Sequence, residues 1–200
     1  LDAAPESRQF LDREEVQQMP HAADDLYRAV KRLPGAAGGD FTAKINVRGG
    51  EQDELLVVLD GVELYEPFHL KDFQSVFSII DSEAIGGVDF LTGGFPVQYG
   101  DRMSGVMDIA VATPSGPAST AVGVGTLNAR LLSQGEYDQG RGSWLVSARA
   151  WYPDEAIEAT GAVAEEILTD YYDLLAKLEH RLGSRSSLSA DLLVATDDLG

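Results

Sequence analysis

The second half of the chain alternates apolar and polar side chains over two consecutive runs. Between residues 172 and 182 one set of alternate positions is mostly apolar and the other mostly charged. Residues 188–194 repeat the alternation after a short segment, Gly183–Ser186, that predicts a turn. Two runs of about ten residues joined by a short turn are typical of a transmembrane β-hairpin. From alternation alone, an amphipathic hairpin in a soluble β-sandwich explains the pattern equally well.

Weaker signals in the same half agree with a strand-rich region. Residues 144–148 predict a further strand that begins at Trp144. Aromatic residues lie near the ends of the predicted strands. In a membrane-spanning strand, these ends are where Trp and Tyr side chains meet the membrane interface. They are Trp151, Tyr152, Tyr171 and Tyr172.

The first half is built from shorter elements of both kinds. Helical spacing of apolar residues predicts a helix over 22–33 and favours another over 73–80. Alternation over 41–47 predicts a half-buried strand. Continuous apolar runs predict buried strands, the first of them followed by a turn at Asp60-Gly61. These runs are 55–59, 88–91 and 106–111. Together the elements predict a small mixed α+β domain.

A break separates the two halves. The segment Thr113-Pro-Ser-Gly-Pro117 interrupts both kinds of periodicity. We therefore expect a first domain over residues 8–113 and a second over residues 118–200.

Composition excludes several function classes. The chain has 15 Lys and Arg against 33 Asp and Glu, a formal charge of −18, so a basic nucleic-acid-binding surface is not expected. It contains no cysteine, which excludes a disulfide scaffold, a thiolate zinc site and a cysteine nucleophile. It has neither a phosphate-binding loop nor a His-Glu-x-x-His pair, and we find no catalytic constellation.

Four motifs carry a family resemblance. In chain order they are Asn46-Val-Arg-Gly-Gly50, Asp53-Glu-Leu-Leu-Val-Val-Leu-Asp-Gly-Val62, Gly93-Gly-Phe-Pro-Val-Gln-Tyr-Gly100 and Arg102-Met-Ser-Gly-Val-Met-Asp-Ile109. The stretch from about residue 10 to 111 resembles the plug domain of TonB-dependent outer-membrane receptors. Residues 142–149 and 170–177 resemble early strands of the barrel in that family.

The resemblance implies an α+β plug domain, a small mixed sheet with short helices, followed by antiparallel transmembrane β-barrel strands. Plugged transporters of this kind use about 22 strands. Residues 116–200 can supply four or five, so we expect the chain to be a fragment of a longer protein. In such a barrel the connection Pro153–Thr169 is expected outside the cell and the Gly183–Ser186 turn on the periplasmic side. Leu1–Phe10 does not match the family's energy-coupling segment.

The resemblance also implies site residues. Arg48, with Gly49 and Gly50, is expected to contact acidic side chains on the barrel wall; a surface arginine at a strand end is the alternative. Residues in apical loops are candidate ligand contacts, and ordinary loop packing is the alternative for each. These candidates are Tyr65, Phe68, His69, Phe95 and Tyr99.

The implied function is TonB-dependent active uptake of a scarce ligand (a siderophore, cobalamin, a glycan or a peptide) across the outer membrane. The expected partners are TonB, the ligand and outer-membrane lipid, and neither a cofactor nor a metal is expected. One alternative is a ligand-binding receptor or sensor module without transport. The other is a soluble metal-dependent enzyme using Asp60, His69 and Asp72. We expect the isolated chain to aggregate or to need detergent, because the apolar faces of its strands would meet water.

Overall fold

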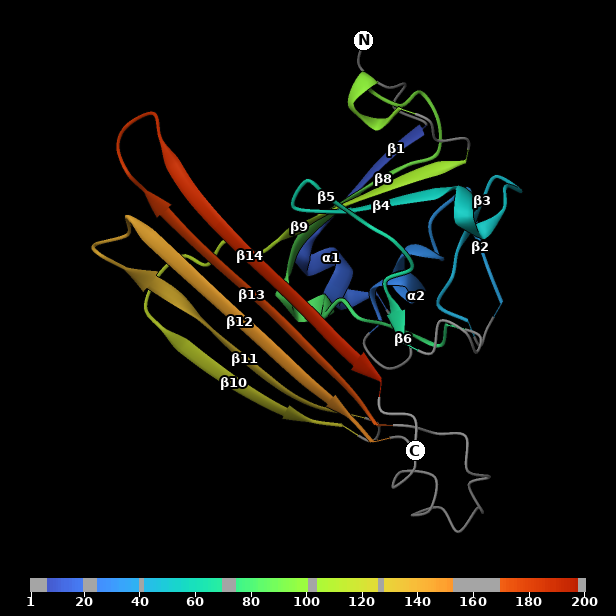
Figure 1. Cartoon of the computed structure of the whole chain (residues 1–200). Coiled ribbons are helices and arrows are strands. Elements are labelled where there is room, and N and C mark those ends of the chain that lie inside the picture. Colours follow the sequence, from blue (N-terminus) through green and yellow to red (C-terminus); the bar gives the residue numbers. More distant parts are fainter. Residues whose placement is uncertain are drawn as a thin grey trace. The chain divides into compact units, whose positions relative to one another are not determined.

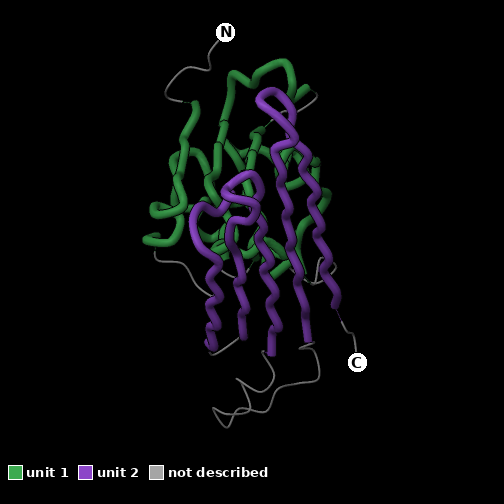
Figure 2. Tube along the Cα trace, turned by 90° about the vertical axis from the view of Figure 1, so that its left-hand side faces the viewer, with its two compact units in different colours: residues 1–112 green, residues 113–200 purple. Residues whose placement is uncertain are grey.

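The computed structural model describes residues 7–19, 25–39, 42–69, 75–100, 104–125, 128–152 and 170–197. The chain divides into two compact units, Leu1–Ala112 and Thr113–Gly200 (Figures 1 and 2). Each unit contains its own five-stranded sheet.

Unit 1 is organised around a mixed sheet with the strand order β1-β8-β9-β4-β5. Strands β4 and β9 run parallel, and the other neighbouring pairs are antiparallel. The five strands are β1 (Arg8–Asp12), β4 (Leu55–Leu59), β5 (Val62–Leu64), β8 (Ile85–Leu91) and β9 (Gly105–Val111). Two small antiparallel pairs accompany them: β2 (Ala36–Ala37) with β3 (Asn46–Val47), and β6 (Phe68–His69) with β7 (Phe77–Ser78).

The helices of unit 1 are short and capped by acidic residues. Helix α1 (Arg13–Gln18) begins with a capping box in which the Asp12 carboxylate accepts from the Glu15 N–H. Helix α2 (Leu26–Val30) begins at Asp25, whose carboxylate accepts from the backbone N–H groups of Tyr27 and Arg28. In the described part of unit 1 there are also single-turn 3₁₀ helices, among them η3 (Gln52–Glu54), η4 (Ser82–Ala84) and η5 (Val97–Tyr99).

One face of the sheet and the two α-helices supply the main core. Val88, Phe90, Met107 and Ile109 from the central strands are 0% exposed. Fully buried side chains of this size contribute roughly 1.5–3 kcal/mol each. The helices add further buried side chains, namely Val16, Leu26, Tyr27, Ala29 and Val30. The short helices are therefore held by packing rather than by their intrinsic stability.

Several sequence predictions for this unit are confirmed. Strand β4 covers 55–59 as predicted, and it is buried at four of its five positions. The turn at Asp60-Gly61 is also present, with φ of 46° and 83° at its two residues. Strands β8 and β9 include the predicted strands at 88–91 and 106–111.

Other predictions for unit 1 need correction. The helix predicted over 22–33 is limited to α2 in the described residues, because turns follow it and Pro34 cannot continue it. The strand predicted over 41–47 is only Asn46–Val47, although Ala43, Ile45 and Val47 are buried as the alternation requires.

Helical spacing over 73–80 was misleading, because Phe77–Ser78 form strand β7. Strand β6 pairs with β7, and the Ser78 N–H donates to the buried Asp25 carboxylate at 2.6 Å. These tertiary partners outweigh the local spacing of apolar residues. Residues 70–74 lie outside the described part of the chain.

Unit 2 is an antiparallel meander in which five strands follow one another in chain order. They are β10 (Ser119–Val124), β11 (Asn128–Tyr137), β12 (Gly142–Trp151), β13 (Tyr171–Arg181) and β14 (Ser187–Asp197). The predicted hairpin is confirmed as β13 and β14, and the weaker strand lies within β12. The connection Pro153–Thr169 lies outside the described residues. No described helix in either unit is long and apolar enough to cross a bilayer.

The turn between β11 and β12 is tight and charged. Asp138, Gln139 and Gly140 all have positive φ, at 55°, 56° and 77°. The Arg141 guanidinium lies 2.7 Å from the Asp138 carboxylate, and this hydrogen bond lowers the pKa of Asp138. The turn thus reverses the chain within four residues.

The register gives the sheet of unit 2 two different faces. On one face, consecutive cross-strand partners form an apolar row of Val122, Leu131, Ala148, Leu174 and Val194. The opposite face carries charged residues, including Arg130, Arg149, Asp173 and Lys177. The alternation identified in the sequence therefore corresponds to a real division between faces.

The strand-end aromatic residues divide between these faces. Tyr172 is 50% exposed on the apolar face, as expected for an interfacial aromatic residue. Trp151 and Tyr171 are partners in register on the polar face, and they are only 1% and 0% exposed. These two therefore lie on the face opposite to Tyr172, because neighbouring residues in a strand point to opposite faces. Their position at a membrane interface stays a prediction.

Candidate functional site

The segment that follows strand β5 brings aromatic and charged residues to the surface of unit 1. Tyr65 directly follows the strand and is 87% exposed. Glu66 has φ of 45°, and its carboxylate pairs with the Lys44 ammonium at 3.2 Å. The ion pair fixes this segment to the chain before β3.

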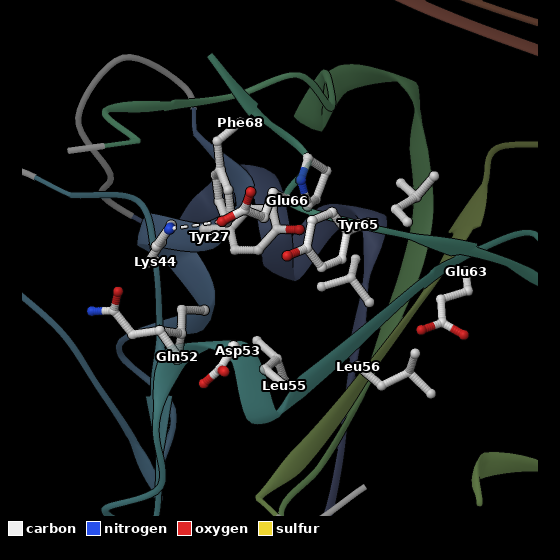
Figure 3. A pocket seen from close by; sticks show the side chains of 14 residues that line it. Tyr27, Lys44, Gln52, Asp53, Leu55, Leu56, Glu63, Tyr65, Glu66 and Phe68 are labelled. Carbon is white, nitrogen blue, oxygen red and sulfur yellow. Dashed lines mark hydrogen bonds and ion pairs between the residues drawn. The ribbon is translucent and has the colours of Figure 1, made fainter. Parts of the chain in front are cut away.

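A small hollow lies beside this segment (Figure 3). It encloses about 90 Å³. Its lining includes Tyr27, Lys44, Gln52, Asp53, Glu63, Tyr65, Glu66 and Phe68. Pockets that enclose a whole small molecule usually measure about 300–1,000 Å³. The hollow can therefore accept a few waters or one chemical group of a larger ligand, but not a complete nutrient molecule.

Tyr27 provides the buried wall of the hollow. Its ring packs edge-on against Phe68, with the centroids 4.8 Å apart. The Tyr27 hydroxyl is buried and has no hydrogen-bond partner in the described part of the chain. Burial, with a smaller effect from the nearby Asp25 carboxylate, raises the pKa of Tyr27 well above 10.0. Tyr27 therefore stays a neutral hydroxyl.

The five predicted ligand residues do not form one cluster. Tyr65 and Phe68 line the hollow together. His69 is the next residue of strand β6 and is only 1% exposed, so its side chain is not available at the surface.

Phe95 and Tyr99 lie in a second place, the segment 93–100 between β8 and β9. Both pack against a buried apolar cluster of Leu56, Val58, Leu91 and Val106. The Tyr99 hydroxyl donates to the Asp108 carboxylate. Partial burial and this hydrogen bond raise the pKa of Tyr99.

The predicted plug–barrel residues occupy a turn after strand β3. Arg48 and Gly49 have φ of 49° and 81° and are exposed, and the Arg48 N–H donates to the Gly35 carbonyl at 2.9 Å. Gly50 has no room for a side chain, because an added Cβ would lie 2.5 Å from the Ser104 Cβ. Gly50 is therefore needed for close packing within unit 1. The expected contact of this turn with a barrel wall stays a prediction.

Unit 2 contains a buried ion pair that the sequence analysis missed. Arg149 Nη2 lies 2.7 Å from Asp173 Oδ2, and the two side chains are 1% and 4% exposed. The Trp151 indole N–H donates to the same oxygen at 3.0 Å, and the Arg149 guanidinium lies 5.2 Å from the Trp151 ring centroid. Charged residues at alternate positions of otherwise apolar strands were the available signal.

The described residues give no support to a metal centre. They contain no group of three or more His, Asp or Glu side chains placed to hold an ion. The Asp60 carboxylate instead accepts from the Val111 N–H at 3.0 Å, within the turn between β4 and β5. Asp72, the third member of the alternative metal site, lies outside the described residues.

Comparison with protein families decides the assignment. The model for the "TonB-dependent Receptor Plug Domain" matches residues 1–106. The chain belongs to the TonB-dependent receptor family. The resemblance recognised in the four motifs is thereby confirmed, and the family is one of receptors and transporters rather than enzymes.

Solved TonB-dependent receptor structures share the fold of both units. The siderophore receptor PirA from Pseudomonas aeruginosa matches with a TM-score of 0.67 and 16% identity, covering 99% of this chain and 36% of that one. The outer membrane transporter YddB from Escherichia coli matches with a TM-score of 0.68 and 9% identity, covering 96% of this chain and 33% of that one. The copper transporter OprC matches with a TM-score of 0.65 and 13% identity, covering 97% of this chain and 30% of that one. No curated protein sequence matches the chain significantly.

These comparisons confirm the predicted fold class. A mixed-sheet plug followed by antiparallel strands matches the TonB-dependent receptor architecture over nearly the whole chain. The chain spans about a third of the length of the solved structures it matches. At such low identities the likeness concerns the fold alone.

Proposed function

We propose that this protein acts in TonB-dependent active uptake of a scarce ligand across the outer membrane. Residues 8–113 serve as the plug, and residues 118–200 supply strands of the surrounding barrel. Membership of the TonB-dependent receptor family supports this proposal. The proposed location is the outer membrane, and the proposed partners are TonB, the ligand and membrane lipid.

The two-faced sheet of unit 2 is the observation that carries the proposal. Leu178, Leu188 and Leu192 are 49%, 60% and 50% exposed on the apolar face. Exposed leucines in a row are unfavourable in water, but they suit the hydrocarbon side of an outer-membrane barrel. The opposite face carries a buried, charge-paired arginine, which suits the interior of such a barrel.

The edges of this sheet support a larger barrel. Strands β10 and β14 each pair with one neighbour within the described residues. In lipid, every backbone N–H and C=O group needs a partner, so an open sheet is not stable there. We therefore propose that further strands complete the barrel in the whole protein, as the matched structures suggest by their length.

The site residues keep the roles inferred from the family. Tyr65 and Phe68 contact the ligand at the hollow beside β5, and Phe95 and Tyr99 contact it from the segment 93–100. His69 is the exception: it is only 1% exposed, so we do not propose it as a ligand contact. Arg48, Gly49 and Gly50 form the turn that meets the barrel wall.

The ligand class is proposed only as a siderophore, cobalamin, a glycan or a peptide. Among the matched structures, PirA is described as a siderophore receptor and OprC as a copper transporter. Ferric siderophores are therefore the first probes, followed by cobalamin, a maltodextrin and an oligopeptide as probes of the other classes.

Uptake measurements with the full-length protein test the proposal. Cells expressing it should accumulate one of these labelled probes, and they should lose accumulation when TonB is deleted or the proton gradient is collapsed. The protein should be found in the outer-membrane fraction. Recovery in the soluble fraction, or uptake unaffected by TonB loss, would contradict the proposal. Binding without accumulation would favour the receptor or sensor alternative.

A matched pair of variants tests the ligand site. Tyr65→Ala removes an exposed aromatic ring at the hollow, and it should weaken apparent affinity by up to about tenfold, the effect of ~1.4 kcal/mol. Val62→Ala removes another exposed apolar side chain on β5, outside the lining of the hollow, and should have no effect. Equal effects of the two variants would exclude the hollow as the site of contact.

A further inference from the structure

Four polar side chains form a continuous line across the sheet of unit 1. Arg8 on the edge strand β1 forks onto Asp89 of β8, with Nε at 2.7 Å from one carboxylate oxygen and Nη2 at 3.0 Å from the other. Asp89 lies directly opposite Asp108 of β9 in the antiparallel register. The Tyr99 hydroxyl donates to the Asp108 carboxylate.

The centre of this line is electrostatically unfavourable by itself. Two carboxylates directly opposite each other in an antiparallel pair repel. Each has a partner on its outer side that compensates for the repulsion: the Arg8 guanidinium for Asp89 and the Tyr99 hydroxyl for Asp108. The guanidinium is the stronger partner, because it carries a full positive charge and binds in a bidentate way.

The two ends of the line belong to parts of the chain with different constraints. Strand β1 is an edge strand, and β8 is the strand it pairs with. Tyr99 belongs to the segment 93–100, which packs over the apolar cluster of Leu56, Val58, Leu91 and Val106 through Phe95 and Tyr99. Val97 of the same segment is 100% exposed, so the segment has one side on the core and one side in solvent.

We propose that Arg8 is a positioning residue for the segment 93–100, acting through the Asp89–Asp108 pair. While β1 is in place, Arg8 neutralises Asp89, and Asp108 can hold Tyr99 against the apolar cluster. When β1 leaves the sheet, the two carboxylates repel, Asp108 shifts, and the segment is released. This inference rests on the proposed function only where it treats Tyr99 and Phe95 as ligand contacts, and it couples those contacts to the N-terminal strand.

The coupling can be measured by thiol labelling, because residues 1–200 contain no cysteine. Any cysteine elsewhere in the full-length protein is first replaced by serine. Val106→Cys places a small thiol at a 0%-exposed position of the cluster beneath the segment. In the full-length protein in detergent, Arg8→Gln should raise its labelling rate roughly two- to fivefold, the range expected for unrelieved cross-strand repulsion. Arg8→Lys, which keeps the charge, should label close to the wild-type rate.

Two further backgrounds separate electrostatic coupling from general loosening. Combining Asp89→Asn with Arg8→Gln removes the repulsion and should restore slow labelling. In a Tyr99→Phe background, Arg8→Gln should have no additional effect, because the line no longer reaches the segment. Arg13→Gln is the matched control, since Arg13 donates to the Glu83 carbonyl and takes no part in the line.

Several results would overturn the inference. They are an unchanged labelling rate in Arg8→Gln, a failure of Asp89→Asn to restore slow labelling, an equal effect of Arg8→Gln in the Tyr99→Phe background, or an equal effect of Arg13→Gln. Labelling requires neither ligand nor TonB. Loss of the proposed uptake function would therefore leave this result standing, and the reverse also holds.

Discussion

At the scale of single residues, the Tyr27 hydroxyl shows how burial determines chemistry. The sequence marks Tyr27 as one residue of a predicted helix, with nothing to distinguish it. In the structure its side chain is fully buried, and its hydroxyl adjoins a hollow of about 90 Å³. The resulting preference for the neutral form links this one group to the stability of unit 1.

This preference predicts a loss of stability at alkaline pH. The pKa of Tyr27 is raised by burial first and by Asp25 second. A tyrosine in an unfolded chain ionises at about pH 10. As the pH rises through that value, the unfolded state loses a proton that the folded state keeps, so the free energy of unfolding falls.

Tyr27→Phe should remove this part of the alkaline loss. Near neutral pH the variant should unfold no more easily than the wild type, because the lost hydroxyl has no partner in the described residues. Thermal unfolding in detergent, followed at neutral and alkaline pH, measures both effects. The same alkaline slope in both proteins would contradict the assignment to Tyr27.

The candidate site could be predicted from sequence only in part at this scale. Tyr65 and Phe68 stand four and seven residues after a turn marked by Gly61, so their place beyond β4 was readable from order alone. Tyr27 and Lys44 reach the same hollow from elements elsewhere in the chain, and no local pattern indicates that. The Arg149–Asp173 pair depends on register across a connection outside the described residues, which sequence alone does not provide.

At the scale of elements, the sheet of unit 2 has one face without charged pairs in its strand interior and one face that carries charged residues among leucines. Leu192 lies on the apolar face and pairs with Ala176, whereas its neighbour Leu193 pairs with Leu175 on the polar face. Alternation of this kind survives in the sequence, because every second residue meets the same surroundings along the strand. This is why the hairpin of β13 and β14 could be predicted. The helical spacing of apolar residues over 73–80 rests on only a few positions, so it predicts structure less reliably than the longer alternation in β13 and β14.

Adjacent arginine substitutions test the division. Leu192→Arg places a charge on the proposed lipid side near the middle of β14, at a cost of about 2–4 kcal/mol. Leu193→Arg places the same side chain on the opposite face and should cost much less. Denaturant titration of the full-length protein refolded into lipid vesicles compares the two. Equal destabilisation would contradict a lipid-facing surface.

The buried ion pair gives a second prediction for this sheet. Asp173→Asn leaves the Arg149 guanidinium buried without that carboxylate, which should cost about 3–5 kcal/mol. Replacing both residues, as Arg149→Met with Asp173→Leu, removes both buried charges and should cost less. The measurement is the temperature at which the heated barrel no longer migrates as a compact, folded species in gel electrophoresis. A double variant as unstable as Asp173→Asn would show that packing, not charge pairing, dominates.

At the scale of the whole molecule, the connection into unit 2 is fixed to the sheet of that unit. The Glu136 N–H donates to the Gly116 carbonyl at 3.1 Å, and the Thr113 hydroxyl donates to Glu179 at 3.2 Å. Gly135 makes this close approach possible, because a Cβ there would lie 2.6 Å from the Ala118 Cα. The segment 113–118 is therefore an anchored strap and not a free linker.

Gly135→Ala should lift this strap from the sheet. The clash is with backbone, which cannot swing away as a side chain can, so the Glu136–Gly116 hydrogen bond should be lost. Faster protease cleavage within 113–118 is the expected readout. Gly183→Ala is the matched control, because a Cβ at that turn meets nothing within 4 Å. Equal cleavage of the two variants would contradict the anchoring.

The parallel pairing of β4 with β9 has a consequence for the time course of folding. When the chain emerges N-terminus first, Leu55–Leu59 is present well before its parallel partner Gly105–Val111. In the same way, Arg8–Asp12 emerges long before its partner Ile85–Leu91. In the meantime β4 can pair only with β5, a hairpin too small to persist alone. The plug sheet therefore cannot close until almost all of unit 1 has emerged. Such non-local pairing makes for slow folding and leaves the apolar run of β4 in need of protection during this interval.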